Sequence, residues 1–369
     1  MVDHLVLNNR RFLYSQIING DFGQTSLSPF EVNTLEFCRK WLMGEEYFEL
    51  TTSGSTGTPK PIQISRNQMK ASAAMTIEKL ELEAGDHILV CMNTAYIAGK
   101  MMLVRGLEGN MAMTIVTPVA DPFKDLSPHA RFAFTALVPL QMETLLKGPL
   151  AYQEILNAMK AIIIGGGAVS NKLEEAIQEV EAPVYSTYAM TETVSHIAMR
   201  RLNGPDKSDS YQTLPGVTIG QDDRGCLTIH APVTNFETIV TNDLVTIIDA
   251  HSFAWKGRVD NVINSGGIKI HTEQLEHNAE KVLLQFNIHN RFFVAGIPDD
   301  SLGEAVVLVM EGESLESNIE HSLLNALKQS LPKYHMPKKI FYLARFILTD
   351  TGKIQRKMSL SACINKNTP

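Results

Sequence analysis

Residues 161–180 read AIIIGGGAVSNKLEEAIQEV, and this stretch decides the fold class. Its first four residues, Ala161 to Ile164, are all apolar, which is typical of a strand buried on both faces. Three glycines form the turn that follows. Ser170 then offers an N-cap for a helix that extends to Val180 and carries its apolar residues on one face. A buried strand, a tight turn and an amphipathic helix in this order predict an α/β fold with parallel strands, in which ligands bind at the carboxyl ends of the strands.

The alternation of strand and helix extends toward the N-terminus, whereas the pattern after Leu214 changes. Two further apolar runs, His87–Cys91 and Met113–Val116, predict buried strands of a large N-terminal α/β domain. After Leu214, short apolar runs alternate with turn residues, which indicates a β-rich subdomain. Its expected strands are Val217–Ile219, Cys226–Ile229, Thr238–Val240 and Leu244–Ile248.

A second, smaller domain is expected at the C-terminal end. The segment Gly257–Gly267 is polar and contains glycines, so we predict a connector there. We therefore divide the chain into a large domain of residues 1–259 and a small domain of residues 260–369. The small domain is predicted to be α+β, with helices at Thr272–Leu284 and Asn318–Leu331 and strands at Arg291–Ala295, Ala305–Met310 and Ile340–Leu343.

Composition and charge exclude several classes of protein. The 369 residues carry a formal net charge of −7, which argues against binding to nucleic acid through a basic surface. No apolar run approaches the ~20 residues that a membrane helix needs, and the first residues lack a signal-peptide pattern. The four cysteines lie far apart, without a metal-binding spacing. These features predict a cytoplasmic protein with free thiols and no integral membrane segment; they leave open whether it forms a homo-oligomer.

The densest cluster of phosphate-binding residue types lies in residues 51–60, which read TTSGSTGTPK. Glycines let backbone N–H groups approach phosphate oxygens, hydroxyls add donors, and a lysine adds a compact positive charge. The spacing of glycine and lysine does not fit a Walker A loop. A polar surface hairpin is the alternative interpretation of this composition. The candidate nucleotide-binding residues here are Thr52, Ser53, Gly54, Ser55, Thr56, Gly57 and Lys60.

The decapeptide resembles the signature phosphate loop of the adenylate-forming superfamily, which contains acyl-CoA synthetases, luciferases and nonribosomal adenylation domains. A second motif of that family follows in the expected order, because residues 188–193 (YAMTET) resemble its Tyr-Gly-x-Thr-Glu motif, with Ala189 in place of the glycine. The resemblance implies that Tyr188 lies beside the adenine, that Thr191 contacts the α-phosphate and that Glu192 holds Mg²⁺. A capped helix start is the alternative for Thr191 and Glu192.

Two more motifs complete the nucleotide site that the resemblance implies. One is similar to the glycine turn that faces the adenine and the acyl group, although three glycines alone are more often a flexible turn; it consists of Gly165, Gly166 and Gly167. The other, at residues 241–243 (TND), resembles the Thr-x-Asp motif, whose aspartate binds both ribose hydroxyls as a two-acceptor carboxylate. A solvated turn residue is the alternative for Asp243.

Motifs near the C-terminal end imply that the second domain moves. Residues 257–261 (GRVDN) and 265–270 (SGGIKI) resemble the hinge segment of the family. The resemblance assigns Arg258 to the ribose or a phosphate and Asp260 to the pivot; a surface ion pair, worth only ~0–1 kcal/mol, is the alternative for these two. The path of the attacking thiol is assigned to Gly266, Gly267 and Lys269. Residues 351–357 (TGKIQRK) resemble the motif that carries the adenylation lysine, here Lys353.

A more specific resemblance indicates the acid. Residues 96–100 (YIAGK), followed by Arg105, are similar to a stretch of the bacterial o-succinylbenzoate–CoA ligases of menaquinone biosynthesis. Tyr96 and Ala98 replace the histidine and the serine of that stretch. The resemblance implies that Arg105 binds the second carboxylate of the substrate, which suits a bidentate guanidinium, and that Tyr96 and Ser195 line the acyl pocket. A surface arginine at a helix end is the alternative for Arg105.

The resemblance as a whole implies an ATP-dependent ligase with two half-reactions. The carboxylate of the acid, expected to be o-succinylbenzoate, attacks ATP to give an acyl-adenylate, and CoA then takes the acyl group and releases AMP. The expected small molecules are ATP, Mg²⁺ and CoA, and the expected catalytic residues are Lys353, Glu192 and Thr191. The alternatives are an adenylating ligase for another aryl or short acyl acid, transfer to a carrier-protein thiol, or a nucleotide-binding protein without catalysis.

Overall fold

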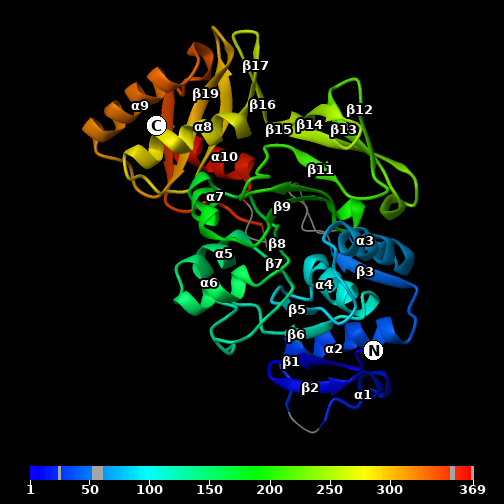
Figure 1. Ribbon diagram of the computed structural model, residues 1–369. Coiled ribbons are helices and arrows are strands. Elements are labelled where there is room, and N and C mark those ends of the chain that lie inside the picture. The colour runs from blue at the N-terminus through cyan, green and yellow to red at the C-terminus, as the bar shows by residue number, and fades with distance from the viewer. Residues whose placement is uncertain (24–25, 52–60, 350–353, 367–369) are drawn as a thin grey trace.

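The computed structural model describes residues 1–23, 26–51, 61–349 and 354–366, which form a large unit and a small unit. In Figure 1 the small unit, yellow to red, lies at one end of the molecule, and the N-terminal strands, in blue, lie at the other. Each unit has its own sheet: within the described residues, thirteen strands form the large sheet and five form the small one. The α/β fold with a β-rich part and a small C-terminal α+β part, which the sequence predicts, is confirmed.

The centre of the large sheet is a run of parallel strands in the order β9-β8-β7-β5-β6-β1. Parallel strands need crossover connections, and helices lie between consecutive strands of this run except between β6 and β7. The strands are β1 (His4–Leu7), β5 (His87–Val90), β6 (Ala112–Ile115), β7 (Phe134–Leu137), β8 (Ala161–Ile164) and β9 (Val184–Ala189), with β2 (Arg10–Leu13) antiparallel to β1 at the edge. The helices are α1 (Tyr14–Asn19), α2 (Pro29–Leu42), α3 (Arg66–Lys79), α4 (Ile97–Glu108), α5 (Pro139–Leu146), α6 (Leu150–Asn157) and α7 (Asn171–Ala176), which the 3₁₀ turn η1 (Ile177–Glu179) continues.

Strand β8 shows how the sequence distributes its side chains between the two faces of the sheet. Successive side chains of a strand point to opposite faces. Ala161 and Ile163 accordingly pack in the core that includes residues of α2, α3 and α4, whereas Ile162 and Ile164 pack in the core that includes residues of α5, α6 and α7. The apolar run therefore forms a strand covered on both faces, as predicted.

Serine caps begin two of the helices that cover the sheet. The Ser28 hydroxyl accepts a hydrogen bond from the backbone N–H of Glu31 at the start of α2, and Ser65 does the same for Gln68 in α3. Between these helices, β3 (Tyr47–Thr51) and β4 (Pro61–Ser65) form a separate antiparallel pair. This pair brings together the two flanks of residues 52–60.

Beyond β9 the large sheet continues with antiparallel strands, in the spatial order β12-β13-β14-β15-β11-β10. These are β10 (His196–Arg201), β11 (Tyr211–Thr213), β12 (Thr218–Gln221), β13 (Cys226–His230), β14 (Thr238–Asp249) and β15 (Ser252–Arg258), with the 3₁₀ turn η3 (Pro232–Thr234) before β14. The sequence predicts two strands at Thr238–Val240 and Leu244–Ile248, but the structure has one. The polar residues between them stay extended because Asp243 pairs with Arg258 on β15.

The small unit begins directly after β15, and its sheet has the order β17-β16-β19-β18, with β20 beside β19. Helices α8 and α9 pack in one core against the sheet, and α10 contributes Cys363 to a second core. The elements are η4 (Val259–Asn261), β16 (Val262–Ser265), β17 (Ile268–His271), α8 (Thr272–Gln285), β18 (Phe292–Asp299), β19 (Gly303–Glu311), α9 (Ser317–Ser330), η5 (Lys333–His335), β20 (Lys339–Leu343) and α10 (Arg356–Lys366).

The link between the two sheets is shorter than the predicted connector Gly257–Gly267. Gly257 and Arg258 belong to β15, and Val262–Ser265 form β16, so η4 alone joins the sheets. Strand β16 forms because Ile263, 3% exposed, packs in the core of the small unit. On this basis we propose to keep the division into residues 1–259 and 260–369.

The small unit contacts the large unit at the start of α7. The backbone N–H and the side-chain amide of Asn171 donate to Oε2 of Glu280 on α8, at 3.1 and 2.6 Å. The same amide donates to the carbonyl oxygen of His277 at 3.1 Å. These hydrogen bonds join the two units a few residues beyond the three glycines that follow β8.

Two expectations from composition concern cysteines and membranes. The four cysteines, Cys38, Cys91, Cys226 and Cys363, are all buried, and none forms a disulfide in the described part of the chain. Across the described ranges, no helix combines the length and the apolar character that crossing a bilayer requires.

Candidate functional site

The glycine turn after β8 lies at the carboxyl edge of the parallel strands. Strands β8 and β9 pair in parallel, with Ile164 opposite Ser186, so both end at the same edge of the sheet. A Cβ on Gly165 would lie 2.8 Å from Oγ1 of Thr187 on β9, which is too close for a side chain. Gly166 has φ of 80°, in the left-handed region that favours glycine. The close approach to Thr187 thus explains why residue 165 is a glycine, and the positive φ explains why residue 166 is one.

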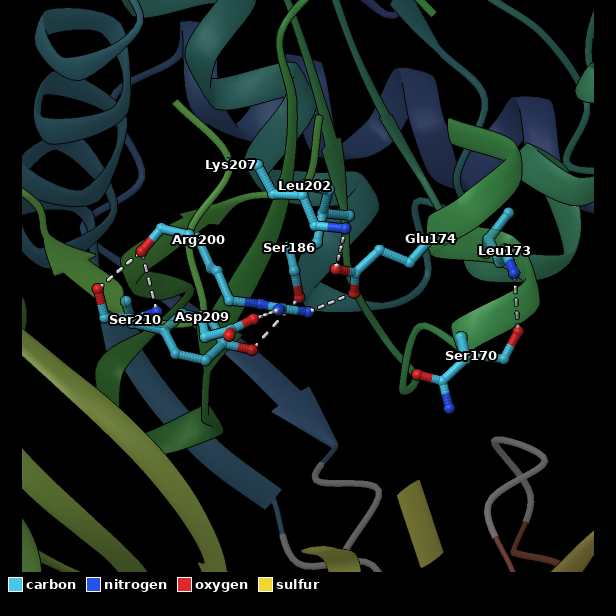
Figure 2. A network of polar contacts seen from close by, with 12 residues as sticks. Ser170, Leu173, Glu174, Ser186, Arg200, Leu202, Lys207, Asp209 and Ser210 are labelled. Carbon is cyan, nitrogen blue, oxygen red and sulfur yellow. Dashed lines mark hydrogen bonds and ion pairs between the residues drawn. The ribbon is translucent and has the colours of Figure 1, made fainter. Parts of the chain in front are cut away.

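Ion pairs fix helix α7, which follows this turn. Glu174 on α7 pairs with Arg200 on β10 at 3.0 Å and with Lys207 at 3.1 Å. Figure 2 shows these three side chains converging between α7 and the sheet, while the Ser170 hydroxyl accepts from the N–H of Leu173 at the helix start. Helix α7 is therefore fixed both by the N-cap hydrogen bond of Ser170 and by the ion pairs of Glu174.

Asp243 on β14 is a buried carboxylate in the antiparallel part of the large sheet. It is 7% exposed. The Tyr188 hydroxyl on β9 donates to its Oδ2 at 2.7 Å, and Trp255 Nε1 on β15 donates to its Oδ1 at 3.3 Å. Burial, followed by the charge of Asp243, raises the pKa of Tyr188. A carboxylate has about four acceptor positions, so Asp243 keeps acceptor capacity for a ligand, and the interpretation as a solvated turn residue is wrong.

Arg258, the last residue of β15, lies between two carboxylates at the point where the chain leaves the large sheet. Its Nη1 lies 3.6 Å from Oδ1 of Asp243, and its Nη2 donates to Oδ2 of Asp260 at 3.0 Å. Asn242 Nδ2 also donates to Oδ2 of Asp260, at 3.3 Å. The ion pair of Arg258 and Asp260 is thus present, and it connects η4 to the buried Asp243.

Thr191 and Glu192 follow β9 in the 3₁₀ turn η2 (Thr191–Thr193), and Glu192 is exposed. No cluster of three or more His, Cys, Asp or Glu side chains suited to a metal occurs in the described part of the chain. Mg²⁺ in nucleotide enzymes is usually bound by one or two carboxylates together with substrate phosphates, not by a protein cage. A single accessible carboxylate at Glu192 fits that type of site.

The chain reverses after η2 through a strained turn. Val194 has φ of 65° and ψ of −54°, and the N–H of Ser195 donates to the carbonyl oxygen of Thr193 at 2.6 Å. These values define the rare γ-turn with positive φ, which is costly for a β-branched residue. Such strain costs on the order of 1–3 kcal/mol and concentrates at functional sites. After this turn Ser195 contacts Arg105 on α4, and His196 contacts Thr76 on α3.

Arg105 is a buried cation in the last turn of α4. The residue is 2% exposed, its Nη2 donates to the Ser195 hydroxyl at 3.0 Å, and its Nη1 lies 3.8 Å from the sulfur of Met102. Its Nε is buried and has no hydrogen-bond partner among the described residues. Among the ion pairs of the described residues, none joins Arg105 to a carboxylate. The interpretation as a surface arginine is therefore wrong, and Arg105 and Ser195 lie together, as expected.

The other predicted pocket and path residues lie apart from Arg105. Tyr96 is the exposed N-cap of α4, roughly 13 Å from Arg105 along the helix axis. Gly266 and Gly267 form the turn between β16 and β17 in the small unit, with φ of 59° and 80°, and Lys269 on β17 is exposed. A Cβ on Gly266 would lie 3.0 Å from the Tyr334 ring.

Several predicted site residues lie outside the described residues. They comprise the phosphate loop from Thr52 to Lys60 and the adenylation lysine Lys353. The strands β3 and β4 on both sides of the loop are described and pair with each other.

Three side chains of this region are absent from the sequence predictions. Trp255 and His196 lie on strands and resemble ordinary core residues. Thr76 lies on the buried face of α3 with Met69 and Ala73. A hydroxyl on that apolar face is the one local signal that points to a buried polar contact.

Comparison with known proteins identifies the family of the chain. Residues 45–224 match the AMP-binding enzyme family. The chain is 41% identical to an acyl-CoA synthetase (AMP-forming)/AMP-acid ligase II-like protein from Dyadobacter fermentans DSM 18053, with 92% of this chain and 96% of that chain covered and a TM-score of 0.62.

Two more distant proteins carry a substrate in their names. A 2-succinylbenzoate–CoA ligase of Bacillus cereus is 27% identical over 94% of this chain and 74% of its own length. The o-succinylbenzoate CoA synthetase of Bacillus subtilis, solved with its acyl-adenylate, has the same fold, with 21% identity, 84% of this chain and 68% of that chain covered, and a TM-score of 0.70. With 41% identity to a relative that it covers almost completely, this chain belongs to the AMP-forming acyl-CoA synthetases.

Proposed function

We propose that this AMP-forming acid–CoA ligase activates an acid with a second carboxylate, and that the acid is o-succinylbenzoate. The observation that carries the proposal is Arg105, which is 2% exposed and whose Nε lacks a hydrogen-bond partner within the part of the chain that the structure describes. The name of the Bacillus cereus relative supports the same acid.

The energetics of Arg105 favour an anionic ligand. Burial lowers its pKa from 12.5 to about 9, so the group still carries its charge near pH 7. A buried charge is costly unless it is paired and hydrogen-bonded. The last turn of α4 supplies partial compensation through the helix dipole, and Ser195 supplies one neutral acceptor. A carboxylate from the substrate would complete the pairing, with the side-on fork of Nε and Nη2 as its donors.

The nucleotide is assigned to the carboxyl edge of the parallel strands. In this assignment Tyr188 and the turn of Gly165, Gly166 and Gly167 border the adenine, and Asp243 receives ribose hydroxyls. Arg258, which already neutralises Asp243 at 3.6 Å, adds a positive charge toward the ribose or a phosphate. Thr191 would donate to the α-phosphate, and Glu192 would hold Mg²⁺, which would supply positive charge to the phosphates.

In the first half-reaction the substrate carboxylate attacks the α-phosphorus of ATP, and pyrophosphate leaves. Positioning and electrostatic stabilisation dominate such phosphoryl transfer. The phosphate loop with Lys60 is assigned to the departing phosphates, and Lys353 to the charge that builds between the two anions; both assignments rest on the motif resemblance.

In the second half-reaction the CoA thiolate attacks the acyl carbonyl, and AMP leaves. No enzyme thiol takes part in this scheme. Burial raises the pKa of Cys38 and of Cys91 to about 12, so neither is a nucleophile near pH 7. Asp260 and the passage beside Gly266, Gly267 and Lys269 are assigned to the hinge and to the approach of CoA.

An assay with a panel of acids tests the proposed function. The protein is incubated with ATP, Mg²⁺, CoA and either o-succinylbenzoate, 4-oxo-4-phenylbutanoate (the same skeleton without the ring carboxylate), or short aliphatic acids. We expect equal amounts of AMP and thioester, with o-succinylbenzoate the best substrate. AMP formation with another acid but not with this one would remove the substrate assignment. No AMP with any acid would favour a nucleotide-binding protein without catalysis.

A further inference from the structure

A chain of four polar side chains connects helix α3 to the buried arginine. Thr76 Oγ1 on α3 lies 3.1 Å from Nε2 of His196, and Nδ1 of His196 lies 3.3 Å from the Ser195 hydroxyl. That hydroxyl in turn lies 3.0 Å from Nη2 of Arg105. Thr76, His196 and Arg105 are all less than 4% exposed, whereas Ser195 is half-buried. The hydrogen bond between Thr76 and His196 is therefore shielded from solvent.

The direction of each hydrogen bond among these four side chains follows from the direction of the bond that Thr76 donates. The Thr76 hydroxyl has one hydrogen, which it donates to the carbonyl oxygen of Ser72 at 3.0 Å. Its oxygen therefore accepts from His196, which places the imidazole proton on Nε2. In a neutral imidazole Nδ1 is then an acceptor, so the Ser195 hydroxyl donates to it. The Ser195 oxygen is left as an acceptor for Arg105.

The surroundings of His196 keep it neutral. Burial, and secondly the positive charge of Arg105, hold the pKa of His196 well below its usual value. Protonation of His196 would also conflict with the observed contacts. Its Nδ1 would then donate to the Ser195 oxygen, and the Ser195 hydrogen would have to point toward the Arg105 guanidinium, which is itself a donor. The neutral form with hydrogen on Nε2 is the one that every contact requires.

We propose that His196, held as the Nε2-protonated form by Thr76, is a positioning residue that sets the specificity for acids with a second carboxylate. By making Ser195 an acceptor, it fixes one edge of the Arg105 guanidinium and leaves the Nε edge free for the substrate. This inference rests on the proposed role of Arg105, but it assigns a new function to two side chains that do not touch the substrate.

Two pairs of variants test the proposal by kinetics of pyrophosphate release. Thr76→Val removes the acceptor for Nε2, whereas Thr76→Ser keeps it. His196→Gln keeps a donor near the position of Nε2 but loses the acceptor for Ser195, whereas His196→Asn keeps an acceptor near the position of Nδ1. We expect Thr76→Val and His196→Gln to raise KM for o-succinylbenzoate about tenfold, the usual effect of one lost hydrogen bond. KM for 4-oxo-4-phenylbutanoate should change less than about twofold, and Thr76→Ser and His196→Asn should behave like the wild type.

The outcomes separate this inference from the proposed function. If the wild-type protein adenylates neither acid, or does not prefer o-succinylbenzoate, the proposed function fails. If the wild type has the preference but Thr76→Val and His196→Gln raise KM for both acids equally, or for neither, the positioning role fails. Equal effects of His196→Gln and His196→Asn would likewise show a packing role only.

A spectroscopic measurement decides the question even where a variant does not fold. The protein is labelled with ¹⁵N in its histidines, and long-range ¹H–¹⁵N correlation spectra distinguish the two neutral forms. His196 is expected to show hydrogen on Nε2 at pH 7 and to retain it when o-succinylbenzoate binds. Hydrogen on Nδ1, or a protonated ring, would overturn the proposal.

Discussion

Replacing Arg105 with leucine is expected to lower kcat/KM for o-succinylbenzoate by about 10²- to 10³-fold, because loss of one partner of a buried charge pair costs about 2–5 kcal/mol. Activity with 4-oxo-4-phenylbutanoate should stay within about threefold of the wild type. That acid has no ring carboxylate, so it makes no contact that the loss of Arg105 would remove. Steady-state kinetics with both acids measure the two effects in one variant.

Although Arg105→Leu should lower activity with o-succinylbenzoate, it should leave the stability of the free protein unchanged or raise it. In the free protein Arg105 has no carboxylate partner among the described residues, so an apolar side chain of similar size removes a desolvation cost. The midpoint of thermal unfolding should therefore be unchanged or raised. Arg66→Leu is the matched control, because Arg66 lies over the Trp41 ring at 4.2 Å and pairs with Glu108 at 3.9 Å. It should change KM of neither acid; a loss for both acids in Arg105→Leu would contradict the account.

Lys353→Ala is expected to abolish acid-dependent exchange of pyrophosphate into ATP, because one lost preorganised donor at a charge-building transition state costs about 10²- to 10³-fold in rate. Thioester formation from supplied acyl-adenylate and CoA should remain near the wild-type rate. Lys353 lies outside the described residues, so this expectation rests on its motif alone.

Lys357→Ala is the control for this experiment, because Lys357 stands in the same basic motif and is exposed at the start of α10. It should affect neither half-reaction strongly. Equal loss of both half-reactions in Lys353→Ala would refute the separation of roles.

The parts of the fold that local patterns determine were predictable from the sequence. The four apolar residues of β8 and the glycines after them form a signal that is complete within seven residues. By contrast β16 has one fully apolar pair, Val262 and Ile263, in a polar stretch. It pairs along its whole length with β17, across the turn of Gly266 and Gly267, and joins β19 only where Ser265 lies opposite Gly303. The hairpin partner is close in the sequence, but the pairing with β19 is not, so a local pattern shows only part of what makes this segment a strand.

In the candidate site, too, the residues were predictable from local motifs but their contacts with one another were not. Tyr188, Asp243 and Arg258 were predicted from motifs. Their mutual contacts arise from the register of β14 and β15 and from the Tyr188 hydroxyl, which reaches Asp243 from β9. Arg105 and Ser195 are 90 residues apart, and their hydrogen bond depends on the strained turn at Val194.

Thr76 and His196 could not be assigned in advance. A threonine on a helix and a histidine in a strand are ordinary core residues until their partners are known. Only the packing of α3 against the β9–β10 connection brings Thr76 Oγ1 to 3.1 Å from His196.

A crystal structure of the protein with a non-hydrolysable analogue of the o-succinylbenzoyl adenylate tests the central claim most directly. The account predicts the ring carboxylate at about 2.7–2.9 Å from Nε and Nη2 of Arg105, with the Ser195 hydroxyl still directed at His196. A ring carboxylate that faces solvent or binds other side chains, with Nε of Arg105 still unpaired, would contradict it.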